Sequence, residues 1–112
     1  KPMQWFFRYE DYLLSDYVTR CKGRTPASAL MPMSVRRLRE HDQQKGSHLL
    51  ELLRAYLENE MNVAQTIRQT YMHRNTFLYR LEKIEEIGAL DLSDPDVRLE
   101  LRFAFKLMDE DR

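Results

Sequence analysis

The chain has 112 residues and no net charge, because 18 Lys and Arg balance 18 Asp and Glu. Hydrophobic residues make up 43% of it and charged residues 32%, the composition of an ordinary globular domain. Its single cysteine, Cys21, excludes an internal disulfide, and no apolar run approaches the ~18 residues that a membrane span requires. We therefore expect a cytoplasmic protein without a membrane segment, built as one domain with a leader.

The charges are unevenly distributed along the chain. Residues 61–84 carry four basic and one acidic side chain, a net charge of +3, whereas residues 85–112 carry four basic and nine acidic side chains, a net charge of −5. A basic segment attracts phosphate groups locally even on a neutral protein. Random scatter of the charges is the alternative explanation.

The first periodic segment lies at residues 9–21, where apolar residues recur at helical spacing until Gly23 and Pro26 end the pattern. The chain begins at Lys1 inside an aromatic stretch and without a methionine. We therefore expect it to be cut from a longer protein. Residues 1–33 would form a leader, or the edge of an upstream domain, with one helix.

A second helix is predicted from an N-cap at Ser34 to about Gln44. Val35 and Leu38 would face inward. The opposite face carries an arginine cluster formed by Arg36, Arg37 and Arg39. This cluster is either a solvated face or a phosphate contact that flanks a DNA site.

The strongest amphipathic pattern follows Gly46, with Ser47 as the expected N-cap. Five apolar residues repeat at the spacing of one helix face, and we call them the leucine stripe: Leu49, Leu52, Leu53, Tyr56 and Leu57. Leu50 widens the stripe beyond what one partner helix needs. The stripe could therefore feed a larger core or a dimer contact.

Residues 62–87 predict two helices joined by a tight turn. Asn62 is a good N-cap, and Gln65 stands where a capping box has Glu or Gln. The apolar residues of the first helix are Val63, Ala64 and Ile67. Residues 70–72 form the turn, and the second helix runs from about residue 73 to 87. This is the outline of a helix-turn-helix, whose second helix enters the major groove of DNA.

Helical geometry divides the second helix into a buried and an exposed side, at about 100° per residue. The residues expected to be buried are Phe77, Leu81 and Ile84. The residues expected to face outward are Asn75, Thr76, Tyr79 and Lys83. Arg74 and Arg80 flank the buried side, where contact with phosphate, contact with a base and a structural role are all open.

Gly88 is expected to end this helix as its left-handed C′ residue, and Asp94 with Pro95 forms a natural start for a last helix. That helix is predicted to run to about Met108, and its apolar face is formed by Val97, Leu101, Ala104, Phe105 and Met108. The sequence thus predicts an all-α, compact multi-helix domain of about six helices, with a helix-turn-helix inside residues 34–112.

No residue pattern favours an enzyme or a metal site. The chain has no glycine-rich phosphate loop, and its histidines, His41, His48 and His73, have no partners at metal-ligand spacing. Glu40 and Asp42 adjoin His41, but neighbours on a helix face different ways, so we interpret them as surface residues with a structural Asp42. We expect neither catalysis nor a cofactor.

Three segments carry a resemblance to a known family. HDQQKGSHLLELLRAYL (residues 41–57), HRNTFLYRLEKI (residues 73–84) and the closing segment with Asp94-Pro95 resemble the C-terminal helix-turn-helix domain of PucR/CdaR-type bacterial transcriptional regulators. The likeness covers residues 34–108, and a more distant one links the motif to Fis-type proteins. It implies a transcription factor, usually an activator, that binds operator DNA as a homodimer and joins the nucleoid when bound. A metabolite would be sensed by a separate N-terminal region that is not in this chain.

The resemblance also implies which residues contact DNA: His73, Arg74, Asn75, Thr76, Tyr79 and Arg80. We add Lys83 from the second helix and Gln65 from the first as DNA-binding candidates. Thr66 and Ile67 depart from the small alanines that the family often has there, and Thr70 departs from a usual leucine. The larger Ile67 implies a change in how closely the two helices pack.

Two functions follow. The first is sequence-specific DNA binding by the C-terminal domain of a metabolite-responsive regulator. The alternative is a helical dimerisation or protein-interaction module that does not read DNA, as the leucine stripe suggests. A continuous positive face around residues 73–83 favours DNA, and an apolar face there favours a protein partner.

Overall fold

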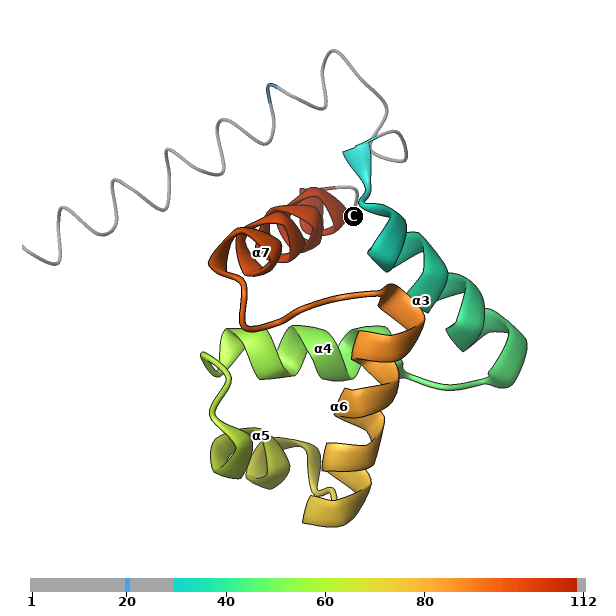
Figure 1. Cartoon of the computed structure of the whole chain (residues 1–112). Helices are drawn as coiled ribbons and strands as arrows, with labels where there is room; N and C mark the ends of the chain where they lie inside the picture. The colour runs from blue at the N-terminus through green and yellow to red at the C-terminus, as the bar shows by residue number, and fades with distance from the viewer. Residues whose placement is uncertain (1–19, 21–29, 111–112) are drawn as a thin grey trace, which may run out of the picture. The chain divides into compact units, whose positions relative to one another are not determined.

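The structure, a computed structural model, describes Arg20 and residues 30–110 (Figure 1). The chain divides into two compact units, one of residues 32–102 and the other of residues 1–31 with 103–112. The description below concerns the first unit unless stated otherwise. The helix predicted at residues 9–21 falls, except for Arg20, outside the described residues.

The described part of the chain is all-α, as predicted, and contains no strand. Its five helices are α3 (Met33–Lys45), α4 (Leu49–Glu58), α5 (Val63–Thr70), α6 (Arg74–Gly88) and α7 (Pro95–Glu110). In the first unit, α3 packs on α4 and α6, and α4 packs on α5 and α6 (Figure 1). None of the described helices is both long and apolar enough to cross a bilayer.

Helix α3 begins one residue before the predicted N-cap. Pro32 is the N-cap, and the prediction of Ser34 in that role is wrong. The Pro32 carbonyl accepts the first helical hydrogen bond, from the Arg36 N–H at 3.2 Å, and proline has no N–H of its own to satisfy. Val35 and Leu38 are fully buried, as predicted. The side chains of the arginine cluster are exposed.

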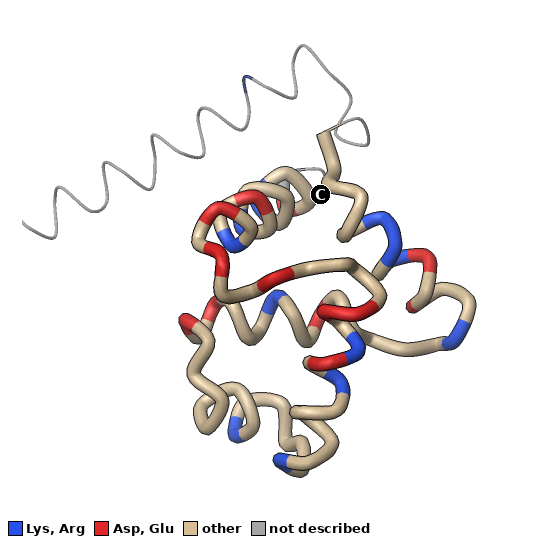
Figure 2. Tube along the Cα trace, in the orientation of Figure 1, with Lys and Arg blue, Asp and Glu red and all other residues tan. Residues whose placement is uncertain are grey.

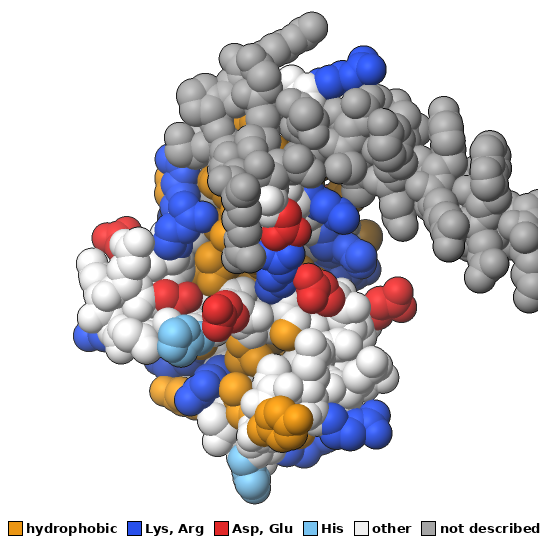
Figure 3. Space-filling model, turned by 180° about the vertical axis from the view of Figure 1, so that it is seen from behind, with side chains coloured by type: hydrophobic (Ala, Val, Ile, Leu, Met, Phe, Trp, Pro, Cys, Tyr) orange, Lys and Arg blue, Asp and Glu red, His pale blue; other side chains and the backbone are white. Residues whose placement is uncertain are grey.

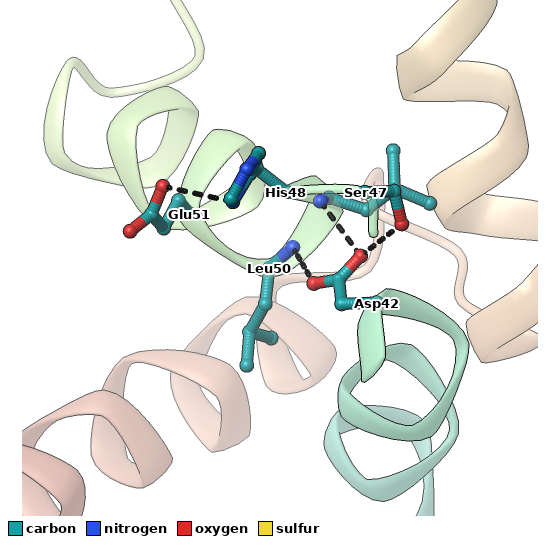
Figure 4. Close-up of polar contacts among 6 residues, drawn as sticks. Asp42, Ser47, His48, Leu50 and Glu51 are labelled. Atoms are coloured by element: carbon teal, nitrogen blue, oxygen red, sulfur yellow. Dashed lines mark hydrogen bonds and ion pairs between the residues drawn. The ribbon is translucent and has the colours of Figure 1, made fainter. Parts of the chain in front are cut away.

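The N-terminus of α4 is capped by a side chain of the preceding helix, α3, rather than by a residue of the segment that joins the two helices. Ser47 was the predicted cap, but Asp42 of α3 accepts hydrogen bonds from the backbone N–H groups of Leu49 at 2.9 Å and Leu50 at 3.0 Å. The Ser47 hydroxyl donates to the same carboxylate (Figure 4). A carboxylate at a helix N-terminus also interacts favourably with the helix dipole. Asp42 thus has the predicted structural role, and the Ser47 prediction is wrong.

The core of the first unit lies between α3, α4 and α6. All five residues of the leucine stripe are buried, so the stripe feeds the core, and Leu50 is half-buried. The rings of Tyr56 and Phe77 meet edge to face with centroids 5.6 Å apart. Burial raises the pKa of Tyr56 above its ordinary value, and the negative charge of Glu85 raises it further. Each large buried side chain contributes ~1.5–3 kcal/mol as an upper estimate.

Helix α6 ends differently from the prediction. Gly88 is its last residue, and Ala89 is the left-handed residue, with φ of 53°. The space around Gly88, rather than its backbone angle, favours glycine, because an added Cβ would lie 3.0 Å from Leu90 Cδ1. Helix α7 begins as predicted, with Pro95 as its first residue and the Asp94 carboxylate accepting from the Asp96 N–H at 2.9 Å.

The apolar face predicted for α7 differs between its two halves. In the first unit, Leu101 is buried and Val97 is half-buried. In the second unit, Ala104 and Phe105 are buried as predicted. Met108 was also expected to be buried but is only half-buried, and Leu107 is fully buried instead. The helix also continues two residues beyond the predicted end.

Candidate nucleic-acid interface

Helix α5 starts as predicted but buries a different side. The Asn62 side chain accepts a hydrogen bond from the Gln65 N–H at 2.9 Å, which confirms the N-cap. Thr66 is fully buried, whereas Ala64 is exposed and Ile67 is half-buried. The Thr66 hydroxyl donates to the Asn62 carbonyl at 2.8 Å, so the polar group is satisfied within the helix. Thr66 therefore occupies the inward position, whereas the prediction from apolar character alone had placed Ala64 there.

Asn59 joins the end of α4 to the end of α5. Its side-chain amide donates to the Ala55 carbonyl at 2.9 Å and to the Gln69 side-chain oxygen. The next two residues, Glu60 and Met61, both have positive φ, of 53° and 62°, so the chain turns sharply before α5 begins. Sequence reasoning missed this bridge, because an asparagine at a helix end gives no signal for a partner ten residues away.

The turn between α5 and α6 comprises residues 71–73, one residue later than predicted. Tyr71 is left-handed, with φ of 54° and ψ of 37°, and its N–H donates to the Ile67 carbonyl. His73 is the N-cap of α6, because its Nδ1 accepts from the Asn75 N–H at 3.1 Å. The cap uses Nδ1 of the ring, so Nε2 is the ring nitrogen that a partner could contact.

Most of the residues predicted to contact DNA are brought together at the start of α6. Six of them are exposed: His73, Arg74, Asn75, Thr76, Tyr79 and Arg80. Lys83 is half-buried, and its Nζ lies 5.8 Å from the centroid of the Tyr79 ring, a cation–π contact. Gln65 is exposed but lies apart from this group, in the first turn of α5 at the far end of that helix from the turn.

The end of the unit that carries the turn is basic. Residues 61–81 include Arg68, Arg74 and Arg80 and no acidic residue. None of these three arginines forms an ion pair with another residue in the described part of the chain. Figure 2 shows only basic positions among the charged ones around α5 and the start of α6. Viewed from behind in Figure 3, the same lower end has basic side chains and a histidine, and acidic side chains lie higher.

This arrangement suits a polyanion. Exposed arginines beside the N-terminus of a helix attract phosphate, and short polar side chains on its first turn can reach base edges. Exposed apolar side chains also occur here, namely Tyr71, Leu78 and Tyr79. No group of three or more metal-ligating side chains lies close together within the described residues.

Comparison with known proteins identifies the family. Residues 49–107 match the model of the PucR C-terminal helix-turn-helix domain. The chain is 42% identical to the Purine catabolism regulatory protein of Bacillus subtilis (strain 168) over 65 residues, which cover 58% of this chain and 12% of that protein. It is 33% identical to the Carbohydrate diacid regulator of Escherichia coli (strain K12) over 112 residues, covering 99% of this chain and 28% of that protein.

A third relative is the Proline-responsive transcriptional activator PutR of Bacillus subtilis (strain 168), 34% identical over 71 residues, which cover 63% of this chain and 17% of that protein. No solved structure matches the chain. The chain thus spans only a minor part of the length of each of these relatives. The family match covers more than half of the chain, from the start of α4 through α5, the turn and α6 into α7. The chain therefore belongs to the PucR family of bacterial transcriptional regulators and carries its DNA-binding helix-turn-helix.

Proposed function

We propose that this chain reads operator DNA for a metabolite-responsive regulator, with the start of α6 in the major groove. The observation that carries the proposal is the exposure of six polar or basic residues, one at the N-cap and five in the first turns of α6, inside a segment without acidic residues. Residues 34–112 would form the DNA-binding domain and residues 1–33 a leader. The regulator would act as an activator.

The exposed residues differ in what they can contact. The Asn75 amide can bond an adenine at two positions, and Thr76 suits a base edge or a phosphate. Arg74 and Arg80 can reach phosphate or guanine. Lys83 is held beside Tyr79 and would add phosphate affinity. These roles, with His73 offering Nε2 and Gln65 contacting from α5, are the proposed DNA interface.

The whole regulator would bind DNA as a homodimer in the cytoplasm, associated with the nucleoid. Its effector would be a small metabolite bound by a region outside this chain. The names of three relatives support a small metabolite as the effector: one is a purine catabolism regulatory protein, one a proline-responsive activator and one a carbohydrate diacid regulator. The effector of this protein is not implied by those names.

In-vitro selection of DNA sites, followed by binding measurements at several salt concentrations, tests the proposal. Arg80→Ala and Lys83→Ala should each weaken binding and reduce the slope of log affinity against log salt by about one unit per lost phosphate contact. Arg102→Ala is the matched control, because Arg102 is an exposed arginine on α7 of the same unit. It should leave the slope unchanged. Binding without salt dependence, or without any enriched site, would contradict the proposal.

A further inference from the structure

The α5–α6 turn presents a side chain that the proposed interface does not use. Resting on the proposed function, we propose that Tyr71 contacts the DNA backbone beside the groove that α6 enters, with its phenolic hydroxyl donating a hydrogen bond to a phosphate oxygen. Tyrosine is one of the side chains that proteins use for phosphate contacts, which position the protein without reading sequence. Tyr71 would therefore contribute affinity and not specificity.

The first support is exposure. Tyr71 is 95% exposed, more than any other large hydrophobic side chain in the described part of the chain. Its hydroxyl makes no hydrogen bond to a described residue. The side chain therefore does nothing for the packing of the turn, and both its ring and its hydroxyl are available to a partner.

The second support is the backbone. Tyr71 has φ of 54° and ψ of 37°, a left-handed conformation that bulky residues rarely adopt and that glycine or asparagine adopts readily. Within the described residues, Tyr71 forms a hydrogen bond only through its backbone N–H, which donates to the Ile67 carbonyl at the end of α5. Glycine would keep that bond without the strain. An exposed aromatic in a strained conformation points to a function for the side chain.

The third support is location. Tyr71 lies two residues before His73, so their Cα atoms are at most about 7 Å apart. Arg68 precedes it by less than one turn of helix, and Arg74 follows at the start of α6. A DNA strand held by these arginines would pass the turn. The neutral phenol adds a hydrogen bond to a phosphate there, and its ring can lie against the neighbouring deoxyribose.

The test uses the 112-residue chain, a labelled mixed-sequence duplex at low salt and duplexes recovered by selection. Tyr71→Phe removes only the hydroxyl and should weaken binding to every duplex by about 3- to 10-fold. The salt slope should not change, because a neutral side chain releases no counterion. Tyr71→Gly should weaken binding at least as much while raising the melting temperature by roughly 3–6 °C, because the left-handed strain is relieved.

Ala89→Gly is the matched control. Ala89 is also left-handed, with φ of 53°, but lies after the end of α6, away from the turn. It should raise the melting temperature similarly without changing DNA affinity. Tyr71→Gly that raises the melting temperature and leaves affinity unchanged would overturn the proposal, as would Tyr71→Gly that lowers the melting temperature, which would reveal a structural role. An unaltered affinity of Tyr71→Phe would also overturn it.

Failure of the underlying function is distinguishable from failure of the Tyr71 contact. If the unsubstituted chain binds in a salt-dependent manner and Arg80→Ala reduces the salt slope, the α6 interface stands whatever the Tyr71 variants do. If neither holds, the DNA interface itself is wrong.

Discussion

Replacing Asp42 with alanine tests how α3 holds the start of α4. The carboxylate accepts from the Leu49 N–H at 2.9 Å, the Leu50 N–H at 3.0 Å and the Ser47 hydroxyl. Loss of a side-chain cap costs about 1 kcal/mol, and loss of the charge near the helix dipole costs about 0.3–1 kcal/mol more. The other groups that donate to Asp42 also lose a charged acceptor. Because they are only partly buried, this loss lowers the free energy of unfolding by about 1 kcal/mol more. Asp42→Ala should therefore lower the free energy of unfolding by about 2–3 kcal/mol.

Urea unfolding followed by far-ultraviolet circular dichroism measures this loss, with an unchanged slope against urea showing that only stability has changed. Asp42→Asn retains one acceptor oxygen and should cost about half as much. Glu40→Ala is the control, because Glu40 lies on the same helix, is exposed and accepts only one long hydrogen bond from a described residue, Gln44 at 3.4 Å. If Asp42→Ala and Glu40→Ala cost the same, the capping argument is refuted.

Three further substitutions probe single features. Asn62→Ala removes the cap on the Gln65 N–H and should lower the free energy of unfolding, measured with urea, by about 1 kcal/mol. Asn62→Ser keeps a capping oxygen and should lower it much less. The pKa of Tyr56 is raised in the folded state by burial and then by Glu85, so stability should be unaffected below the ordinary value of 10.0 and fall as pH rises above it. Tyr56→Phe should flatten that fall in melting temperatures measured at alkaline pH, and equal slopes would contradict the argument. Gly46 has φ of 65° and open space where a Cβ would stand, so Gly46→Ala should cost about 1 kcal/mol from backbone strain alone. Gly46→Asn should cost less in the same urea assay, and an equal cost would argue against strain.

The helices with a strong apolar period could be predicted from the sequence. The leucine stripe places five large side chains on one face of α4, and a helix can bury such a face in only one orientation. The same reasoning correctly predicted that Phe77 and Ile84 of α6 are buried in the core and that Asn75 is exposed. Leu81, by contrast, is only half-buried.

Caps and turns were predicted less well, because several depend on partners distant in the sequence. Asp42 replaces Ser47 as the cap of α4, and a propensity argument considers only neighbouring residues. His73 caps α6 although imidazole is outside the usual set of capping side chains. Gly88 suggested a left-handed angle, but its small size serves the approach of Leu90 instead.

The candidate site was predicted as a set of exposed residues, and the structure adds how they are held. The helical angles were enough to predict that Tyr79 faces outward, but they did not predict the contact between its ring and Lys83. Nor could the sequence place Gln65 relative to the start of α6, since that depends on the turn and on the bridge from Asn59 to α5. The contact of these residues with DNA stays a prediction.

Because α6 packs on α3 and α4, the helix-turn-helix could not be transferred to another protein as an isolated segment. Phe77 and Ile84 are fully buried, but α5 is held mainly by α4. A peptide of residues 62–88 would retain the Asn62 and His73 caps and yet expose both core side chains to water. Helices of 8 and 15 residues are too short to persist on caps alone. A chimaera that borrows this reading surface must therefore include residues 33–88, from the start of α3 to the end of α6.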